Sequence, residues 1–157
     1  MNKTHIYIIV AVLALGLIVG VYFYFKPSQG QTGQTGQISL AQIKEKTIAG
    51  IVEFREYVIM VIEKTLNDPT SGMSDTNRII WKDNLPNNKN LVSNGNKQIV
   101  GGINALTNKD EIYNTVTFVV NEMRTIFITP LVSELSDKNI GIDLNKKADD
   151  LLITLKF

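Results

Sequence analysis

The carboxylates of one predicted helix have a spacing that could support acid–base catalysis or metal binding. Glu53 and Glu56 lie three positions apart, and Glu63 follows two turns later. Paired carboxylates can act as general acid and base, or bind metal ions inside helical bundles. Bundle metal sites of that kind also use Glu-x-x-His motifs, but the only histidine of the chain is His5. Because these glutamates lie opposite the apolar face of their helix, we interpret them as a solvated surface with Glu–Lys pairs.

The remaining reactive groups form no familiar constellation. Ser93 and Lys97 have the spacing of a nucleophile and a base, but nothing around them supports that role. The oxygen-rich segment 67–77 lacks the alternating acidic positions of a calcium loop, and we interpret it as a turn with a helix cap. The absence of cysteine excludes disulfides, thiolate catalysis and zinc–cysteine sites. The sequence therefore predicts a protein that is not an enzyme and that uses no cofactor and no metal.

A long helix over residues 40–67 must position the glutamates. Ser39 and Gln42 have the spacing of a capping box before its first turn. Asn67–Asp68–Pro69, followed by Gly72, predicts where it ends. The apolar positions recur at three- and four-residue steps, which indicates one buried face; they are Leu40, Ile43, Ile48, Ile51, Phe54, Val58, Ile62 and Leu66.

The middle of the chain gives weaker signals. Ser74 or Asp75 can cap a short helix that carries Ile79 to Leu85. The composition of residues 86–90 predicts a loop. Residues 91–108 are ambiguous, because glycines interrupt an otherwise helical spacing of apolar residues.

Two further helices complete the predicted domain. An apolar face over 112–127 predicts a helix capped by Asp110, although residues 115–120 are strand formers by propensity. We expect Pro130 to kink or end this helix. Asp143 is the expected cap of a last helix that carries apolar residues up to Leu155. The sum is a mainly α fold: a small bundle of four to five helices over residues 39–157.

The N-terminal segment predicts a membrane anchor over residues 1–26. Ile6 to Phe25 are twenty consecutive residues without a charge, and they form a helix of about 30 Å, the thickness of a bilayer core. Its C-terminal end carries the aromatic residues Tyr22, Phe23, Tyr24 and Phe25, which favour the membrane interface. A cleaved signal peptide is the alternative, but its apolar region would be shorter and followed by small residues. Gly16 and Gly20 form a G-x-x-x-G pair that can support a homodimer through the transmembrane helix.

Residues 27–38 predict a flexible tether between the anchor and the helical domain. Residues 27–37 read PSQGQTGQTGQ, with neither charge nor a large apolar side chain. Such a segment cannot bury enough surface to order itself. Fully extended, it reaches about 40 Å.

The charge distribution of the domain argues against nucleic acid as a partner. Of the 16 Lys and Arg residues, all but Lys3 and Lys26 follow the tether, as do all 15 Asp and Glu residues. The two signs alternate without forming a run, whereas nucleic-acid binding requires a basic stripe. The predicted partners are therefore the lipid bilayer and another protein.

Four residues are candidate contacts for that protein. Arg55 lies near the edge of the apolar face of the first helix, where we expect its long side chain to snorkel to solvent. The alternative is a specific ion pair, either across the bundle or to a partner. Trp81, the only tryptophan, is either a core residue or an interface hot spot. Ile153 and Phe157 fall outside the apolar stripe of the last helix.

The organisation of the chain resembles one group of known proteins. An uncleaved N-terminal helix, a Gly/Gln/Thr tether and a small cysteine-free domain rich in Asn, Ile and Lys resemble minor capsid or inner-membrane proteins of large icosahedral double-stranded DNA viruses. The resemblance rests on residues 1–40 and bulk composition, and it carries no functional residue over. It implies a single-pass virion membrane protein that connects an internal membrane to the capsid shell.

Two alternatives remain open beside that membrane-anchored docking function. One is a single-pass component of a bacterial envelope, acting in secretion, in division or as a spanin, although Gly50, Pro69 and Pro86 interrupt any long heptad repeat. The other is a membrane-tethered enzyme that uses carboxylates alone. Substitution of Glu53 and Glu56 separates this enzyme from the docking protein.

Overall fold

The computed structural model describes residues 38–156, and it is mainly helical there, without a strand in that part of the chain. The predicted anchor, with its Gly16–Gly20 pair, lies outside the described residues, as do residues 27–37 of the predicted tether and Phe157. The elements are α2 (Leu40–Asn67), α3 (Asp75–Ala105), α4 (Lys109–Met123), the π-helical turn η1 (Arg124–Ile128), α5 (Thr129–Ser133) and α6 (Asn139–Thr154). These elements confirm the predicted mainly helical bundle.

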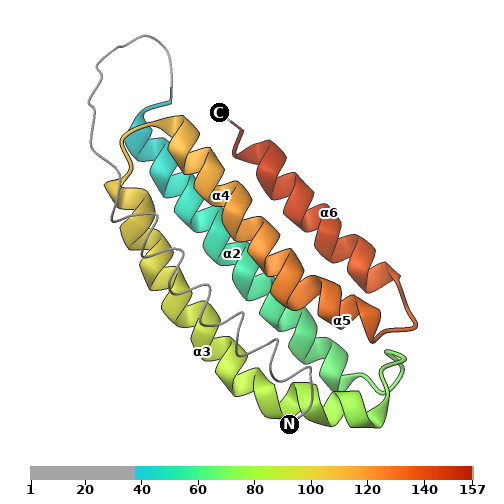
Figure 1. Ribbon diagram of the computed structural model, residues 1–157. Coiled ribbons are helices and arrows are strands. Elements are labelled where there is room, and N and C mark those ends of the chain that lie inside the picture. Colours follow the sequence, from blue (N-terminus) through green and yellow to red (C-terminus); the bar gives the residue numbers. More distant parts are fainter. Residues whose placement is uncertain (1–37, 157) are drawn as a thin grey trace. The chain divides into compact units, whose positions relative to one another are not determined.

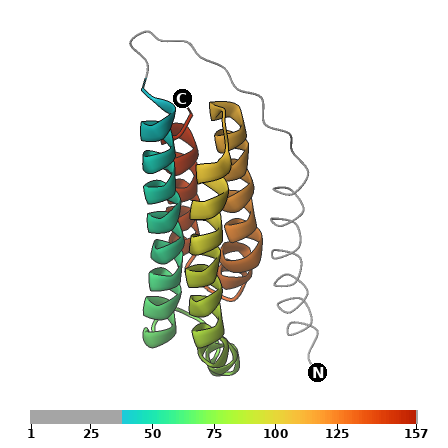
Figure 2. The same ribbon diagram turned by 90° about the vertical axis from the view of Figure 1, so that its left-hand side faces the viewer.

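The helices alternate in direction along the chain (Figure 1). α2 packs against each of the other long helices, α3, α4 and α6, and α4 also packs against α6. The view from the side shows α3 lying along α2, with α4 and α6 behind (Figure 2). α2 is therefore the central element of the described domain.

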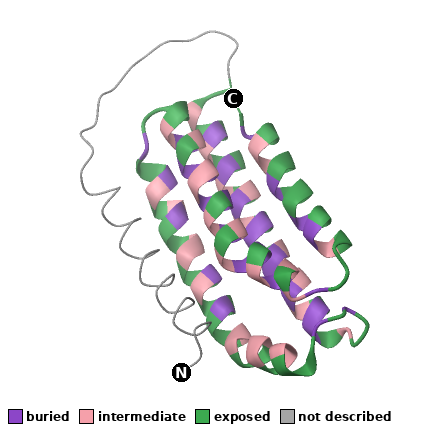
Figure 3. Cartoon of the chain, turned by 45° about the vertical axis from the view of Figure 1, so that its right-hand side comes forward, coloured by how far each residue is buried: buried purple, intermediate pink, exposed green. Residues whose placement is uncertain are grey.

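The core lies along the inward faces of these helices (Figure 3). The largest fully buried apolar side chains come from every long helix, and they include Ile51, Phe54, Ile62, Leu66, Ile103, Ile112, Ile128, Leu131 and Leu144. Burying one such side chain contributes about 1.5–3 kcal/mol. Packing of this kind, rather than intrinsic propensity, holds most of the helices in place.

α2 begins and ends where its sequence predicts. The Ser39 hydroxyl accepts a hydrogen bond from the Gln42 backbone N–H at 3.2 Å, and the Gln42 side chain accepts one from the Ser39 N–H at 3.0 Å. This reciprocal pair is a capping box, and it satisfies two backbone donors that the first turn leaves free. The predicted helix 40–67 is confirmed.

The loop predicted for residues 86–90 was wrong, because α3 is one continuous helix that includes Pro86. For the segment 91–108, which the sequence left ambiguous, the structure shows helix as far as Ala105. Pro86 is exposed, and so is Lys82, the residue whose carbonyl loses its helical N–H partner at a proline. Val92, Ile99 and Ile103 are buried on the opposite side. Burial of these side chains against the rest of the domain thus stabilises the helical conformation despite the proline and the glycines. Of the two predicted caps, the Ser74 hydroxyl is the one that accepts, from the Asn77 N–H at 3.3 Å.

Two helix starts differ from the prediction. The Asn108 side chain, not that of Asp110, caps α4 by accepting from the Glu111 N–H at 2.9 Å. α6 begins at Asn139, four residues before the expected cap Asp143. In α4, Asp110 lies in the first turn instead, where a carboxylate favours the positive end of the helix dipole. α6 has neither an acidic residue in its first turn nor a side-chain cap.

The segment 112–127 is helical, as its apolar period predicts against its strand-forming residues 115–120. Pro130 does not end the helix. The Thr129 N–H donates to the Arg124 carbonyl, one residue further back than in an α-helix. This wider π-type turn comes directly before the proline, which has no N–H of its own to donate. α4, η1 and α5 therefore follow one another without interruption.

Gly72 is the residue that the turn between α2 and α3 requires. Its φ is +76°, and a Cβ at this position would lie 1.7 Å from the Ser136 hydroxyl oxygen.

We expect Gly72→Ala to lower the free energy of unfolding by about 2 kcal/mol or more, through left-handed backbone strain and the clash. Gly101→Ala is the matched control, because a Cβ there meets nothing within 4 Å. It should raise stability by up to about 1 kcal/mol through helix propensity. Urea unfolding measures both, and equal effects would contradict the strain argument.

Candidate functional site

Arg55 is the most unusual side chain of the described domain. It is only 8% exposed, and its guanidinium lies against Gly95 of α3, where a Cβ would be 2.4 Å from Nη2. Its Nε and Nη1 atoms are buried without a hydrogen-bond partner among residues 38–156. The expectation that Arg55 snorkels to solvent is therefore wrong. The missing side chain of Gly95 leaves the space in which α3 covers the guanidinium.

The electrostatic consequence is a buried cation without a counter-charge. Desolvation by burial lowers the pKa of Arg55 to about 10, so the guanidinium still carries its charge at neutral pH. The ion pair across the bundle, one of the two predicted alternatives, is not formed within the described residues. An ion pair to a partner protein stays a prediction.

A groove of about 400 Å³ lies between α2 and α3. Its lining consists of Val52, Glu56, Ile59, Lys89, Val92, Ser93 and Asn96. The Asn96 Oδ1 atom is buried and accepts no hydrogen bond within the described part of the chain. Lys89 forms an ion pair with Glu63, at 2.8 Å. The groove thus combines aliphatic side chains with an unused acceptor, and Arg55 is the residue next to its lining residue Glu56 on α2.

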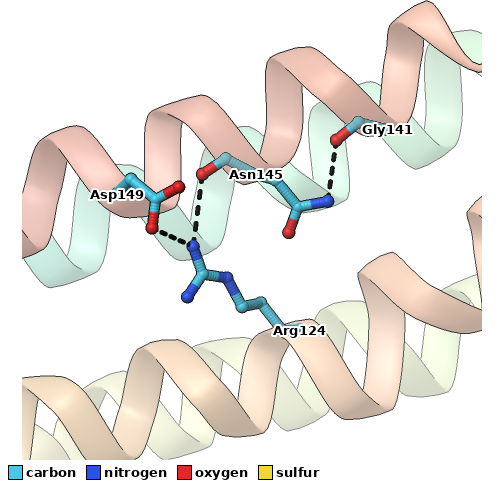
Figure 4. Close-up of polar contacts among 4 residues, drawn as sticks. All are labelled: Arg124, Gly141, Asn145 and Asp149. Carbon is cyan, nitrogen blue, oxygen red and sulfur yellow. Dashed lines mark hydrogen bonds and ion pairs between the residues drawn. The ribbon is translucent and has the colours of Figure 1, made fainter.

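A second surface lies on α6, held in place by Arg124 of η1 (Figure 4). Arg124 Nη2 donates to Asp149 Oδ1 at 2.6 Å and to the Asn145 carbonyl at 3.3 Å. The Asn145 side chain donates to the Gly141 carbonyl at 2.9 Å. A Cβ on Gly141 would lie 2.7 Å from a methyl group of Val132, so this glycine permits the close approach of α6 to α5. These contacts attach α6 to η1 and α5.

The outer side of α6 combines apolar and charged residues. A shallow groove of about 630 Å³ is lined by Val132, Lys138, Gly141, Ile142, Asn145, Lys146 and Asp149. Ile142 is 63% exposed and Ile153 is 72% exposed. Sequence reasoning identified Ile153 but missed Ile142. The spacing of Ile142 and Ile153 could have indicated it, because residues eleven positions apart lie on the same side of a helix.

The other predicted residues lie apart from these two surfaces or only at their edges. Trp81 is partly buried and packs against the core, as its core interpretation predicts. Glu53 is exposed and pairs with Lys147 at 3.4 Å, and Glu56 is exposed at the α2–α3 groove. The surface interpretation of these two glutamates is confirmed. No hydrogen bond joins Ser93 to a base in the described residues, and no group of three potential metal ligands was found there.

Within residues 38–156, no helix is both long enough and apolar enough to cross a membrane. The predicted anchor, Ile6 to Phe25, lies outside that range. The chain matches no protein-family model, no curated protein and no solved structure at a significant level.

Proposed function

We propose that this chain is a single-pass membrane-anchored docking protein. Its helical domain binds a partner protein and ties that partner to the bilayer. The observation that carries the proposal is the uncharged stretch from Ile6 to Phe25, followed by a tether without large apolar residues. The viral resemblance makes a virion inner membrane and its capsid shell the first setting to examine.

The α2–α3 groove is the surface that we propose for the partner. Removing a charge from water is costly unless it is paired, so a buried unpaired cation is more readily understood as a binding feature than as a source of stability. Arg55 does not line the groove, but Glu56 and Asn96 do, and they are the chain neighbours of Arg55 and of Gly95, which the guanidinium contacts. We propose that a partner segment in the groove brings carbonyl or carboxylate oxygens to that guanidinium. It would also offer a donor to the Asn96 Oδ1 atom. Burial of Val52, Ile59 and Val92 beneath that segment would add apolar contact.

The tether gives this docking its effect on affinity. A random coil of eleven residues, the length of the predicted tether, spans about 18 Å on average, which would keep the domain close to its membrane. A partner that also lies at that membrane then meets the domain at an effective concentration in the millimolar range. A weak groove contact is sufficient under these conditions. The bacterial-envelope alternative shares this mechanism and differs only in the membrane and the partner.

Cross-linking mass spectrometry on the membrane fraction or particle, as isolated from its source, tests the docking proposal. Lys89 lines the groove and Lys82 lies on the same helix. We expect both to cross-link to one abundant lattice or coat protein, whereas Lys109 at the start of α4 should give fewer such links. Internal cross-links alone, together with free release of the chain by detergent, would contradict the proposal.

Two substitutions on α3 make this test specific to the groove. Ser93→Arg places a long side chain into the groove, and Asn87→Arg adds the same charge at another exposed position of α3. The first should remove the cross-links from Lys89 to the partner, and the second should leave them.

The enzyme alternative has a test of its own. If the chain turned over a substrate, and Glu53→Gln with Glu56→Gln abolished that turnover in a folded protein, the enzyme alternative would replace the docking function.

A further inference from the structure

One side of α6 carries a short exposed pattern that is independent of the α2–α3 groove. Ile142, Lys146, Asp149 and Ile153 are all exposed. At 100° per residue these four positions fall within about 60° of one another around the helix axis. They therefore form a single stripe, which we call the α6 stripe. Its two ends are apolar, and its centre carries one charge of each sign.

The α6 stripe is self-complementary under a two-fold rotation. The midpoint between Ile142 and Ile153 is also the midpoint between Lys146 and Asp149, and it lies between positions 147 and 148. Two copies of α6 in antiparallel contact would place each Ile142 against Ile153 of the other copy. The same register places each Lys146 against Asp149 of the other copy. We propose that the α6 stripe is a homodimer interface in which two chains pair antiparallel about this axis.

The charges of the stripe are available for this pairing. Of the two carboxylate oxygens of Asp149, Arg124 contacts only Oδ1, which leaves Oδ2 to accept from a second copy. Lys146 forms no ion pair within residues 38–156. Its neighbour Lys147 is already engaged, by Glu53 at 3.4 Å and by the Tyr57 ring at 5.6 Å. The lysine whose register fits the two-fold axis is thus the one without a partner in its own chain.

The groove beside α6 supplies the receiving surface. It is lined by Ile142, Lys146 and Asp149 of the stripe together with Val132 of α5. In the antiparallel register Ile153 of the second copy lies opposite Ile142 and packs into this groove. The arrangement is reciprocal, so each copy both offers an isoleucine and receives one.

The surface area buried between one pair of short helices is smaller than the roughly 1,200–2,000 Å² that a standard stable interface buries. We therefore expect a weak dimer, which forms efficiently when two chains are held in one membrane. Only this gain in dimer formation at the membrane rests on the proposed membrane anchoring. The register of the pairing follows from α6 alone.

Disulfide trapping tests the register directly, because the chain contains no cysteine of its own. Full-length Ile142→Cys and Ile153→Cys variants, purified separately and reconstituted together in liposomes, are oxidised mildly. A disulfide requires Cα atoms about 4.4–6.8 Å apart. In the antiparallel register, residue 142 meets residue 153 of the other copy, whereas equal positions are separated by about 16 Å along the helix. We expect the mixed 142–153 dimer to exceed either same-position dimer at least tenfold.

A charge reversal provides the second variant. Lys146→Asp places two carboxylates opposite each other at both symmetry-related contacts, and it should reduce the mixed dimer about fivefold or more. Lys109→Asp makes the same charge change at the start of α4 and should leave the yield unchanged. Circular dichroism checks that all variants remain helical. Equal yields of the three pairings, or a preference for same-position dimers, would overturn the proposal. The docking function would be unaffected, because its cross-links arise on α3.

Discussion

Replacing Arg55 with methionine should stabilise the helical domain, by up to about 3 kcal/mol at neutral pH. The guanidinium is buried against Gly95 without a partner in the described residues, and desolvation lowers its pKa from the ordinary arginine value to about 10. At about 1.4 kcal/mol for each pKa unit, that shift corresponds to about 3 kcal/mol of desolvation cost in the charged form. Methionine keeps most of the length of the side chain but carries no charge. Urea unfolding followed by Trp81 fluorescence measures the change.

The pH dependence of this difference has a definite sign. Between about pH 10 and the higher ordinary pKa of an arginine, the unfolded chain keeps the Arg55 proton while the folded chain releases it. The unfolded state then binds more protons, so the contribution of Arg55 to stability rises with pH across this window. The advantage of Arg55→Met over the natural chain should therefore be constant below about pH 9 and shrink above pH 10. Comparison of the two proteins cancels the titration of lysines and tyrosines that they share.

The same variant separates a structural role for Arg55 from a binding role. A loss of stability on Arg55→Met would show that the guanidinium has an anionic partner in the folded chain, contrary to the geometry described above. A gain in stability together with a loss of the cross-links from Lys89 to the partner protein is the result that the docking proposal expects. Arg55→Ala is a poorer test, because it also leaves a cavity beside α3.

Arg78→Met should have the opposite effect and destabilise the domain by about 3 kcal/mol. Arg78 Nη1 donates to the carbonyls of Thr65, Leu66 and Asp68 at 3.2, 3.0 and 2.8 Å, which are the last acceptors of α2 and its cap. Its Nη2 donates to the Ser71 hydroxyl at 3.2 Å and to the carbonyl of Met73 at 3.3 Å. The cation thus satisfies a helix C-terminus and the following turn at once. Hydrogen bonds to a charged group contribute about 1.5–3 kcal/mol, and the loss of several such contacts at once places the expected cost at the upper end of that range.

Two further arginine variants calibrate this result in the same urea unfolding experiment. Arg78→Lys should recover part of the loss, because an ammonium keeps the charge but cannot reach both sets of acceptors. Arg124→Met should cost only about 1 kcal/mol, since its partner Asp149 is 61% exposed and such pairs contribute little. If Arg78→Met lowered the free energy of unfolding no more than Arg124→Met does, the contacts of Arg78 with the carbonyls would not stabilise the turn.

Local signals in the sequence were enough to predict several elements. Helix 40–67 could be predicted to the residue, because its apolar period runs along one face and Ser39 and Gln42 form their cap within a single turn. The helical state of residues 112–127 was also correct against the propensity of residues 115–120, since burial of a periodic face outweighs intrinsic preference. The surface position of Glu53 and Glu56 follows from the same periodicity.

Other features depend on residues far apart in the chain. Pro86 lies within α3 because α2 buries the opposite side of that helix, and no local window contains this information. Arg55 was expected to reach solvent, yet Gly95, forty residues later, allows α3 to cover it.

By itself, then, the sequence determined the uncharged N-terminal stretch, the polar tether composition, the mainly helical class and the face that each strongly periodic helix buries. Tertiary structure alone decided that α3 is continuous, that Arg55 is a buried unpaired cation and that Arg124 attaches α6 to η1. The physical reason is the range of the interactions. Periodicity and capping act within a few turns of one helix, whereas desolvation of a side chain depends on which distant segment packs over it.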